Sequence, residues 1–141
     1  MRNIFQRLSA SRFLRFAAVG AAGFFVNEAA LALAHELLGA GPRVGWFIAF
    51  VPAVTFTWWG NRKLTFADKA SDGHVGMLAE WARFVATNGI GAAANFAIYA
   101  ALIGLAPFPL NIPYVALAVG ILVGLVFNFT LSKRLVFRGG A

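Results

Sequence analysis

The chain of 141 residues has no cysteine and only five acidic residues, against twelve Lys and Arg. Without Cys it has neither a disulfide nor a thiolate metal site, and its redox compartment is not indicated. Charged residues amount to 12% of the chain and hydrophobic residues to 60%, whereas soluble domains carry about 25% charged residues. These proportions predict a membrane protein, which we treat as a single domain over residues 1–141.

Long apolar stretches account for most of the hydrophobic residues. A bilayer core about 30 Å thick needs roughly 20 mostly apolar residues in each helix. The second stretch is short, and we expect Trp58 and Trp59 to anchor it at the interface. The sequence predicts an all-α membrane protein with four transmembrane helices, over residues 16–38, 44–60, 84–106 and 112–131. Residues 4–13 and 77–84 are candidates for interfacial helices that lead into the first and third of these.

The connections and the basic residues predict how these helices are arranged. Residues 39–43 and 107–111 are short and contain Gly and Pro, which predicts two helical hairpins. All Lys and Arg residues except Arg43 flank the predicted spans on one side, so both termini and the central loop are predicted to be cytoplasmic. Because these charges bracket apolar spans and do not gather on one face, we expect contact with membrane lipids and no nucleic-acid partner.

The N-terminal segment imitates a signal peptide, but its apolar run is interrupted by polar residues and is repeated later in the chain. RFAAVGAAGFFVN (residues 15–27) aligns with RFVATNGIGAAAN (residues 83–95), 68 residues further on. RKLTF (residues 62–66) aligns with KRLVF (residues 133–137), 71 residues further on. We therefore expect the N-terminus to be retained. Since each copy holds two spans, the two hairpins are predicted to share one orientation.

Asn27, Glu28, Asn95 and Asn128 form a candidate polar seam within the predicted spans. An amide near the bilayer midplane needs a partner, and a hydrogen bond from Asn27 to Asn95 or Asn128 is the structural interpretation. A carboxylate there costs about 2.5 kcal/mol or more and commonly faces a cavity. Phe96 takes the place of Glu28 in the second copy, so Glu28 is either a coupling group or a residue near a water-filled face.

Basic residues gather where each repeat leaves the membrane. NRKLTF (residues 61–66) and SKRLVF (residues 132–137) place paired cations at the cytoplasmic headgroup level, and Arg15 and Arg83 enter the same layer. Such groups suit a phosphate or diphosphate, although each of them also anchors a helix end. The candidate lipid-phosphate-binding residues are Arg15, Asn61, Arg62, Lys63, Arg83, Lys133 and Arg134.

Neither catalysis nor metal binding is indicated. His35 and His74 fall on opposite sides of the predicted membrane, and no Ser/His/Asp set or Gly-rich phosphate loop is present. We predict no enzymatic activity and no cofactor. Gly120 and Gly124 form a G-x-x-x-G pattern that permits close helix contact. Four short helices make a small body in which to enclose a polar pathway, so a homo-oligomer is expected.

Four segments together resemble the GtrA-like family of small four-helix bacterial membrane proteins. They are RFLRFAAVGAAGFFVN (residues 12–27), FTWWGNRKLTF (residues 56–66), EWARFVATNGIGAAANF (residues 80–96) and FNFTLSKRLVF (residues 127–137). The resemblance implies binding roles at Arg15, Asn61, Arg62, Arg83, Asn128 and Arg134. Gly60 and Glu28 depart from the family pattern.

The resemblance also implies a function. Such proteins are implicated in moving polyprenyl-phosphate-linked sugars across the cytoplasmic membrane for surface polysaccharides, often beside a polyprenyl-phosphate glycosyltransferase. Two alternatives stay open. One is a proton-coupled exporter of small cations that uses Glu28, and the other is a non-transporting scaffold for a glycosyltransferase.

Overall fold

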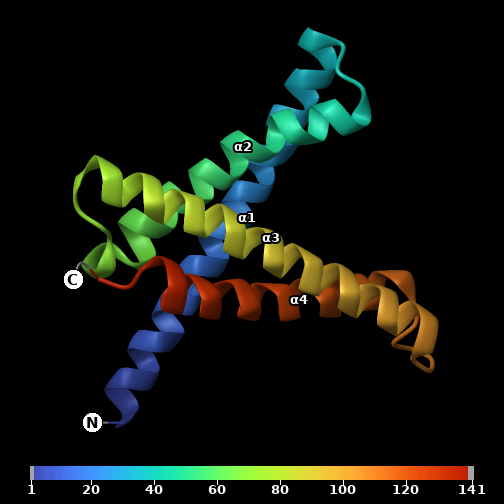
Figure 1. Cartoon of the computed structure of the whole chain (residues 1–141). Helices are drawn as coiled ribbons and strands as arrows, with labels where there is room; N and C mark the ends of the chain where they lie inside the picture. Colours follow the sequence, from blue (N-terminus) through green and yellow to red (C-terminus); the bar gives the residue numbers. More distant parts are fainter. Residues whose placement is uncertain (1, 140–141) are drawn as a thin grey trace. The chain divides into compact units, whose positions relative to one another are not determined.

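The computed structural model describes the backbone of residues 2–139 and the side chains of residues 11–139 apart from residue 42. The regular elements in this part of the chain are all helical (Figure 1), which confirms the predicted all-α class. The side chains of Arg2 and Arg7, which contribute to the predicted cytoplasmic charge, lie outside the described residues. The elements are α1 (Arg2–Leu38), α2 (Pro42–Gly60), η1 (Asn61–Thr65), η2 (Ala67–Lys69), α3 (Gly73–Leu105), α4 (Pro113–Leu131) and η3 (Ser132–Val136).

The helix ends follow from Gly and Pro at the connections. After α1, Gly39 adopts a φ of 59°, a left-handed conformation that glycine tolerates at a helix end. The N–H of Ala40 then donates to the carbonyl of Ala34 at 3.2 Å. Both α2 and α4 begin with proline, at Pro42 and Pro113, where the missing N–H costs no helical hydrogen bond.

Three helical segments are long and apolar enough to cross a membrane, namely Ser11–Leu38, Gly73–Leu105 and Pro113–Val136. The chain is therefore a multi-pass membrane protein. The fourth helix, α2, has 19 residues but falls outside this group. Its sequence includes Arg43, an internal Pro52 and the pair Trp58 and Trp59, all of which lower its hydropathy. The prediction of four spans is thus supported for three helices.

The two long helices begin earlier than the predicted spans. Helix α1 has 37 residues and α3 has 33, so at 1.5 Å per residue each is about 50 Å long or more and exceeds a bilayer core of about 30 Å. The segments expected as interfacial helices, residues 4–13 and 77–84, are therefore continuous with α1 and α3.

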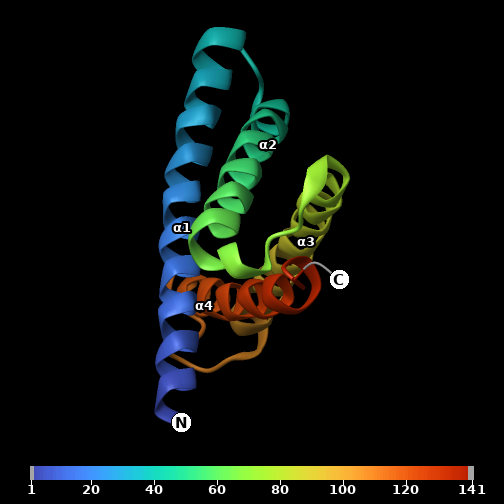
Figure 2. The same cartoon turned by 90° about the vertical axis from the view of Figure 1, so that its left-hand side faces the viewer.

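The described chain divides into two compact units, one of residues 2–73 with Gly139 and the other of residues 74–138. In the first unit α1 and α2 pack side by side and run antiparallel (Figure 2). A side chain at Gly23 would meet the hydroxyl of Thr57, and one at Gly60 would meet Val19 Cγ1 at 2.8 Å. Gly60, which departs from the family pattern, therefore lies where Val19 leaves no room for a side chain.

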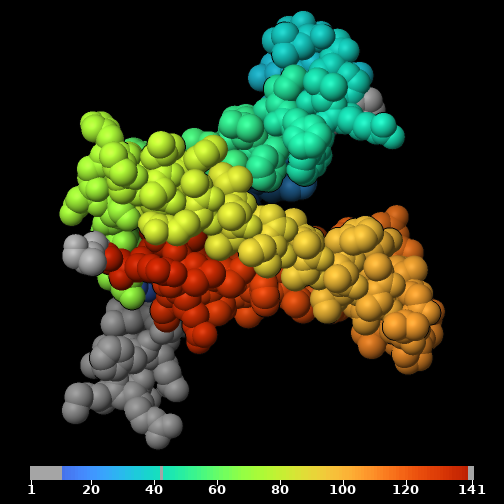
Figure 3. Space-filling view, in the orientation of Figure 1, coloured from blue at the N-terminus to red at the C-terminus, as the bar shows by residue number. Residues whose placement is uncertain are grey.

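In the second unit α3 and α4 approach closely at glycines. A side chain at Gly91 would meet the carboxamide of Asn128, and one at Gly120 would meet the backbone oxygen of Asn95 at 3.0 Å. The side chains of α3 and α4 form one continuous surface along both helices (Figure 3). Large apolar side chains on these helices are exposed, including Phe96 at 71% and Leu122 at 62%, as expected of a lipid-facing surface.

Candidate functional site

Each unit contains a five-residue π-helical turn that follows directly on a helix. The turn η1 follows α2 and is closed by the N–H of Phe66, which donates to the carbonyl of Asn61 at 2.8 Å. The turn η3 follows α4 and is closed in the same way by Phe137 and Ser132 at 2.9 Å. Single π turns of this kind occur frequently at functional sites. The sequence repeat predicted that these two segments are alike, but it gave no indication of their π geometry.

The π geometry explains which residues of the turn are buried. In an α-helix, two residues five positions apart point about 140° away from each other. The i→i+5 bond instead brings the closing phenylalanine close to the direction of the first residue of the turn. Asn61, Phe66, Ser132 and Phe137 are all fully buried. The paired cations between them fall on the opposite side, where Lys63 and Arg134 are exposed.

An aromatic pair fixes each turn against the helix that begins its repeat. The rings of Phe16 and Phe66 meet edge-on, with 6.4 Å between centroids and 68° between planes. Phe84 and Phe137 repeat this geometry at 6.3 Å and 62°. Edge-to-face contact is a favoured arrangement of aromatic rings. Both pairs consist of buried residues, so each turn is held to one place on α1 or α3.

These contacts assemble the predicted phosphate-binding residues into two groups. Arg15 directly precedes Phe16 on α1 and Arg83 directly precedes Phe84 on α3, so each arginine adjoins the phenylalanine that contacts the π turn. We define the first cation set as Arg15, Arg62 and Lys63, and the second cation set as Arg83, Lys133 and Arg134. The structure places the members of each set within one unit.

Protein groups engage every member of the first cation set. Arg15 donates from Nη1 to the carbonyl of Leu64 at 3.2 Å and from Nη2 to Ser11 Oγ at 3.0 Å. Arg62 Nη2 donates to the carbonyl of Ser71 at 2.6 Å. The Lys63 ammonium lies 4.9 Å from the centroid of the Trp59 ring, within the range of a cation–π contact.

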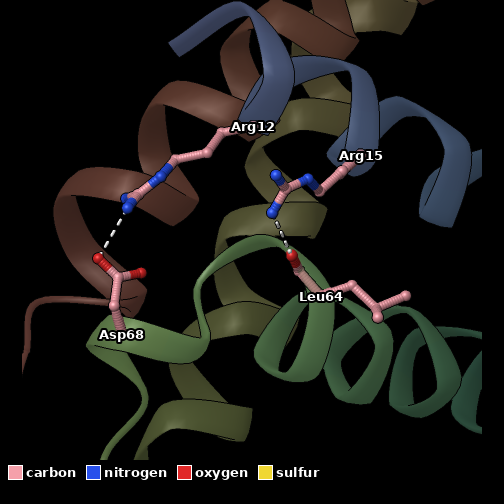
Figure 4. A network of polar contacts seen from close by, with 4 residues as sticks. All are labelled: Arg12, Arg15, Leu64 and Asp68. Atoms are coloured by element: carbon pink, nitrogen blue, oxygen red, sulfur yellow. Dashed lines mark hydrogen bonds and ion pairs between the residues drawn. The ribbon is translucent and has the colours of Figure 1, made fainter. Parts of the chain in front are cut away.

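An ion pair close to the first cation set also joins two segments of the first unit. Arg12 Nη2 donates to Asp68 Oδ2 at 2.7 Å and so joins α1 to η2 (Figure 4). The hydrogen bond from the Arg12 guanidinium holds the pKa of the Asp68 carboxyl below its ordinary value. Sequence reasoning missed this pair, because the partners are 56 residues apart and no repeat or motif links them.

The second cation set lacks the contacts that engage the first. Arg83, Lys133 and Arg134 make no hydrogen bond or ion pair with any residue that the structure describes. Arg83 and Arg134 are exposed and Lys133 is half-buried. Glu80 lies three residues before Arg83 and is fully buried, but the two form no ion pair. The guanidinium and ammonium groups of this set are therefore available to an external anion.

The first residue of each turn carries a buried polar side chain. Asn61 Oδ1 accepts a hydrogen bond from the hydroxyl of Thr65 at 2.8 Å. Asn61 Nδ2 and Ser132 Oγ have no hydrogen-bond partner among the described residues. Asn61, a candidate phosphate ligand, thus has no exposed surface in this structure.

The polar residues of the spans fall into both units. Asn27 Nδ2 lies 3.5 Å from Glu28 Oε1, and Glu28 is exposed. In the second unit Asn128 lies against Gly91, with its Oδ1 buried and without a partner among the described residues, and Asn95 lies against Gly120 and Gly124. Sequence reasoning missed the contact of Gly91 with Asn128. The signal for it was present, because Gly91 occupies the repeat position of Gly23.

Comparison with known proteins adds an independent finding. The model of the family described as GtrA/DPMS, transmembrane domain, matches residues 15–138. This range includes both π turns and all members of both cation sets. A comparison with curated proteins found no match.

Proposed function

Because the chain belongs to the GtrA/DPMS transmembrane-domain family, we propose that it moves polyprenyl-phosphate-linked sugars across the bacterial cytoplasmic membrane. Membership links the chain to processes that involve polyprenyl-phosphate sugars, and proteins of this family are generally non-enzymatic. The product of such transport serves the synthesis or modification of cell-surface polysaccharides. A membrane glycosyltransferase is the expected partner, since it supplies or consumes the lipid-linked sugar.

The observation that carries this proposal is the pair of cation sets at the two π turns. Each set presents arginine and lysine where an apolar helix ends. Guanidinium and ammonium groups there suit a lipid phosphate, which arginine grips with two parallel hydrogen bonds. The polyprenyl tail stays in lipid during transport, so only the head group requires a polar route.

The polar residues of the spans supply that route in our proposal. Asn27, Glu28, Asn95 and Asn128 offer amide and carboxylate groups to sugar hydroxyls at a depth where lipid offers none. The arrangement that we propose has four spans, two hairpins of the same orientation and both termini in the cytoplasm. A homo-oligomer encloses the route, since one copy of the chain is small.

A flipping assay with reconstituted protein tests the proposal. The full chain is placed in liposomes with a fluorescent polyprenyl-phosphate sugar, and the fraction in each leaflet is followed with a membrane-impermeant quencher. We expect equilibration at least about tenfold faster than in protein-free liposomes, and slower equilibration with Arg83→Gln. Arg43→Gln is the matched control, because Arg43 is an exposed arginine outside both cation sets. Equal rates with and without protein contradict the proposal.

One observation favours a second candidate. Glu28 is an exposed carboxylate within the apolar part of α1, and Asn27 lies 3.5 Å from it. Such a group suits a proton-coupled exporter of small cations, in which it exchanges a proton for the substrate. Glu28→Gln abolishes cation export in that case but only modestly slows lipid flipping. Transport of a permeant organic cation, driven by a pH gradient across the same liposomes, separates the two functions.

The exposed apolar surface of α3 and α4 is also compatible with a scaffold that recruits a glycosyltransferase without transport. Copurification of the chain with such an enzyme, together with no flipping activity, favours this function over the first two.

A further inference from the structure

The two cation sets differ in what holds them, and we infer that the second set, Arg83, Lys133 and Arg134, binds the lipid phosphate while the first set braces the fold. This inference rests on the proposed function, because it assigns the phosphate of the transported lipid to one of two similar sites. It also divides the six cations among the candidate residues, which the sequence treats alike, into binding residues and positioning residues.

The bracing of the first set depends on side chains that the second repeat lacks. Arg15 bonds to the hydroxyl of Ser11, but the corresponding residue of the second repeat is Ala79, which has no hydroxyl. Lys63 lies over the ring of Trp59, which corresponds to Thr130. The second repeat thus lacks the hydroxyl and the indole ring that engage these two cations, whereas the Leu64 carbonyl that Arg15 also engages is a backbone group.

The ion pair beside the first set is absent from the second repeat for the same reason. Asp68 corresponds to Gly139, which carries no carboxylate, and Arg12 corresponds to Glu80. Glu80 lies three residues before Arg83 on α3, but the two form no ion pair, and no other residue that the structure describes pairs with Arg83. Among the described residues, the three cations of the second set thus form no hydrogen bond or ion pair.

The turn η3 leaves a further donor unused. In η1 the hydroxyl of Thr65 satisfies Asn61 Oδ1, but in η3 the corresponding residues are Val136 and Ser132, which form no such bond. Ser132 Oγ is fully buried and has no partner among the described residues. An unsatisfied buried hydroxyl is unfavourable in the free protein. This hydroxyl lies on the buried side of η3, away from the exposed Arg134, as the unpartnered Asn61 Nδ2 lies on the buried side of η1.

This combination fits a phosphate monoester or diester at a membrane surface. Arg83 and Arg134 each offer a planar pair of N–H groups, and Lys133 adds an ammonium donor. The first set, by contrast, must break contacts with Leu64, Ser11 and Ser71 before its arginines turn toward a ligand. The second set therefore binds a phosphate at a lower cost of rearrangement.

The test compares two variants that remove the same charge from equivalent turns. The variants are Lys133→Gln with Arg134→Gln, and Arg62→Gln with Lys63→Gln, each in the full chain in phosphatidylcholine nanodiscs. Affinity for a short-chain polyprenyl monophosphate is measured by native mass spectrometry, and the melting temperature of the ligand-free protein by tryptophan fluorescence. Lys63→Gln alone provides the first-set variant if the double variant does not fold.

Two opposite results are expected from this pair. The second-set variant weakens phosphate binding at least about tenfold, since charge-assisted hydrogen bonds are among the strongest, and leaves the melting temperature of the free protein unchanged. The first-set variant lowers the melting temperature and weakens binding less than about threefold. Equal weakening by the two variants overturns the inference.

Two further probes distinguish a phosphate site from a surface attracted to any anion. Phosphatidylglycerol nanodiscs supply another lipid phosphate, and inorganic phosphate supplies the same group without a tail. We expect the monophosphate lipid to bind more tightly than either, and all three to depend on the second set. Binding of these probes that the second-set variant leaves unchanged overturns the inference. A chain that binds through the second set without accelerating flipping contradicts the proposed function but leaves this assignment intact.

Discussion

The ring of Phe66, at the end of η1, lies edge-on against Phe16 of α1 with 6.4 Å between the ring centroids. This contact joins two residues 50 positions apart in the sequence, and its counterpart joins Phe84 to Phe137. Each pair fixes a π turn to the helix that carries the repeat arginine. The position of the cations therefore depends on aromatic packing, and this packing is open to direct test.

We expect Phe66→Ala to destabilise the first unit by about 3 to 5 kcal/mol, the usual cost of truncating a buried aromatic side chain. A double-mutant cycle with Phe16→Ala should give a coupling of about 0.5 to 1.5 kcal/mol. Unfolding in mild detergent, followed by circular dichroism, measures both. Phe96→Ala is the control, since Phe96 is 71% exposed. A cost for Phe66→Ala no larger than that of the control contradicts the burial of the turn.

Gly91→Ala should separate α3 from α4, because the added methyl group meets the carboxamide of Asn128. Overpacking of this kind costs about 1 to 3 kcal/mol, and we expect a lower melting temperature. Gly89→Ala is the matched control, because nothing lies within 4 Å of a side chain there. Since alanine favours a helix over glycine by up to about 1 kcal/mol, the control should be neutral or stabilising. The same result from both variants rules out a close contact at Gly91.

The ion pair of Arg12 and Asp68 gives the first unit a dependence on pH. The Arg12 hydrogen bond lowers the pKa of Asp68 from its ordinary value of 3.8, so the unfolded chain takes up the proton first as the pH falls. The stabilisation is present above that value and is lost as the pH falls through the lowered pKa. Both side chains are partly exposed, so we expect about 0.2 to 1 kcal/mol.

Asp68→Asn isolates this effect. The difference in melting temperature between the native chain and the variant should be present at neutral pH and should shrink below about pH 4, near the ordinary pKa of Asp. Arg12→Gln should show the same profile. A difference that persists undiminished at low pH assigns the effect to a cause other than the carboxylate.

The absence of cysteine allows the topology to be mapped with single Cys substitutions. We expect Asp72→Cys, in the loop before α3, to react with a membrane-impermeant maleimide only after the cells are opened. Gly41→Cys and Asn111→Cys, in the two short connections, should react in intact cells. The pair Gly41 and Asp72 tests α2 specifically, because the two positions flank this helix. Labelling of both from the same side shows that α2 does not cross the membrane.

Composition and hydropathy were enough to predict an all-helical membrane protein, and the resemblance of four segments to the GtrA-like family indicated the family; both findings are confirmed. The helix ends at Leu38, Gly60 and Leu131 also fall where the apolar stretches end. Helices α1 and α3 begin before the predicted spans, because the polar residues in the first turns of a long helix carry no apolar signal. Hydropathy reports where a chain meets lipid, not where its backbone becomes helical.

The sequence predicted which residues form the candidate site but not how they are arranged in space. The repeat identified the cations and their paired spacing, since both are read directly from the amino-acid sequence. The aromatic pairs and the bond from Arg15 to Leu64 join residues 49 or more positions apart, and the π turns depend on a backbone geometry that no side-chain pattern indicates. Such contacts leave no periodic pattern. The difference between the two cation sets became visible only when the partners of Arg15 and Lys63 were compared with Ala79 and Thr130 in the second repeat.

The two π turns also fix the number of residues between the end of α2 or α4 and the phenylalanine that closes the turn. If one residue between Asn61 and Phe66 is removed, the backbone hydrogen bond closes an ordinary α-helical turn. The phenylalanine then rotates by about 100° about the helix axis, away from Phe16. An inserted residue rotates it in the other sense. Exchanging one cation for another changes only the outward face. We therefore expect these segments to tolerate an exchange of their exposed side chains, such as Arg134 for lysine, better than an insertion or a deletion.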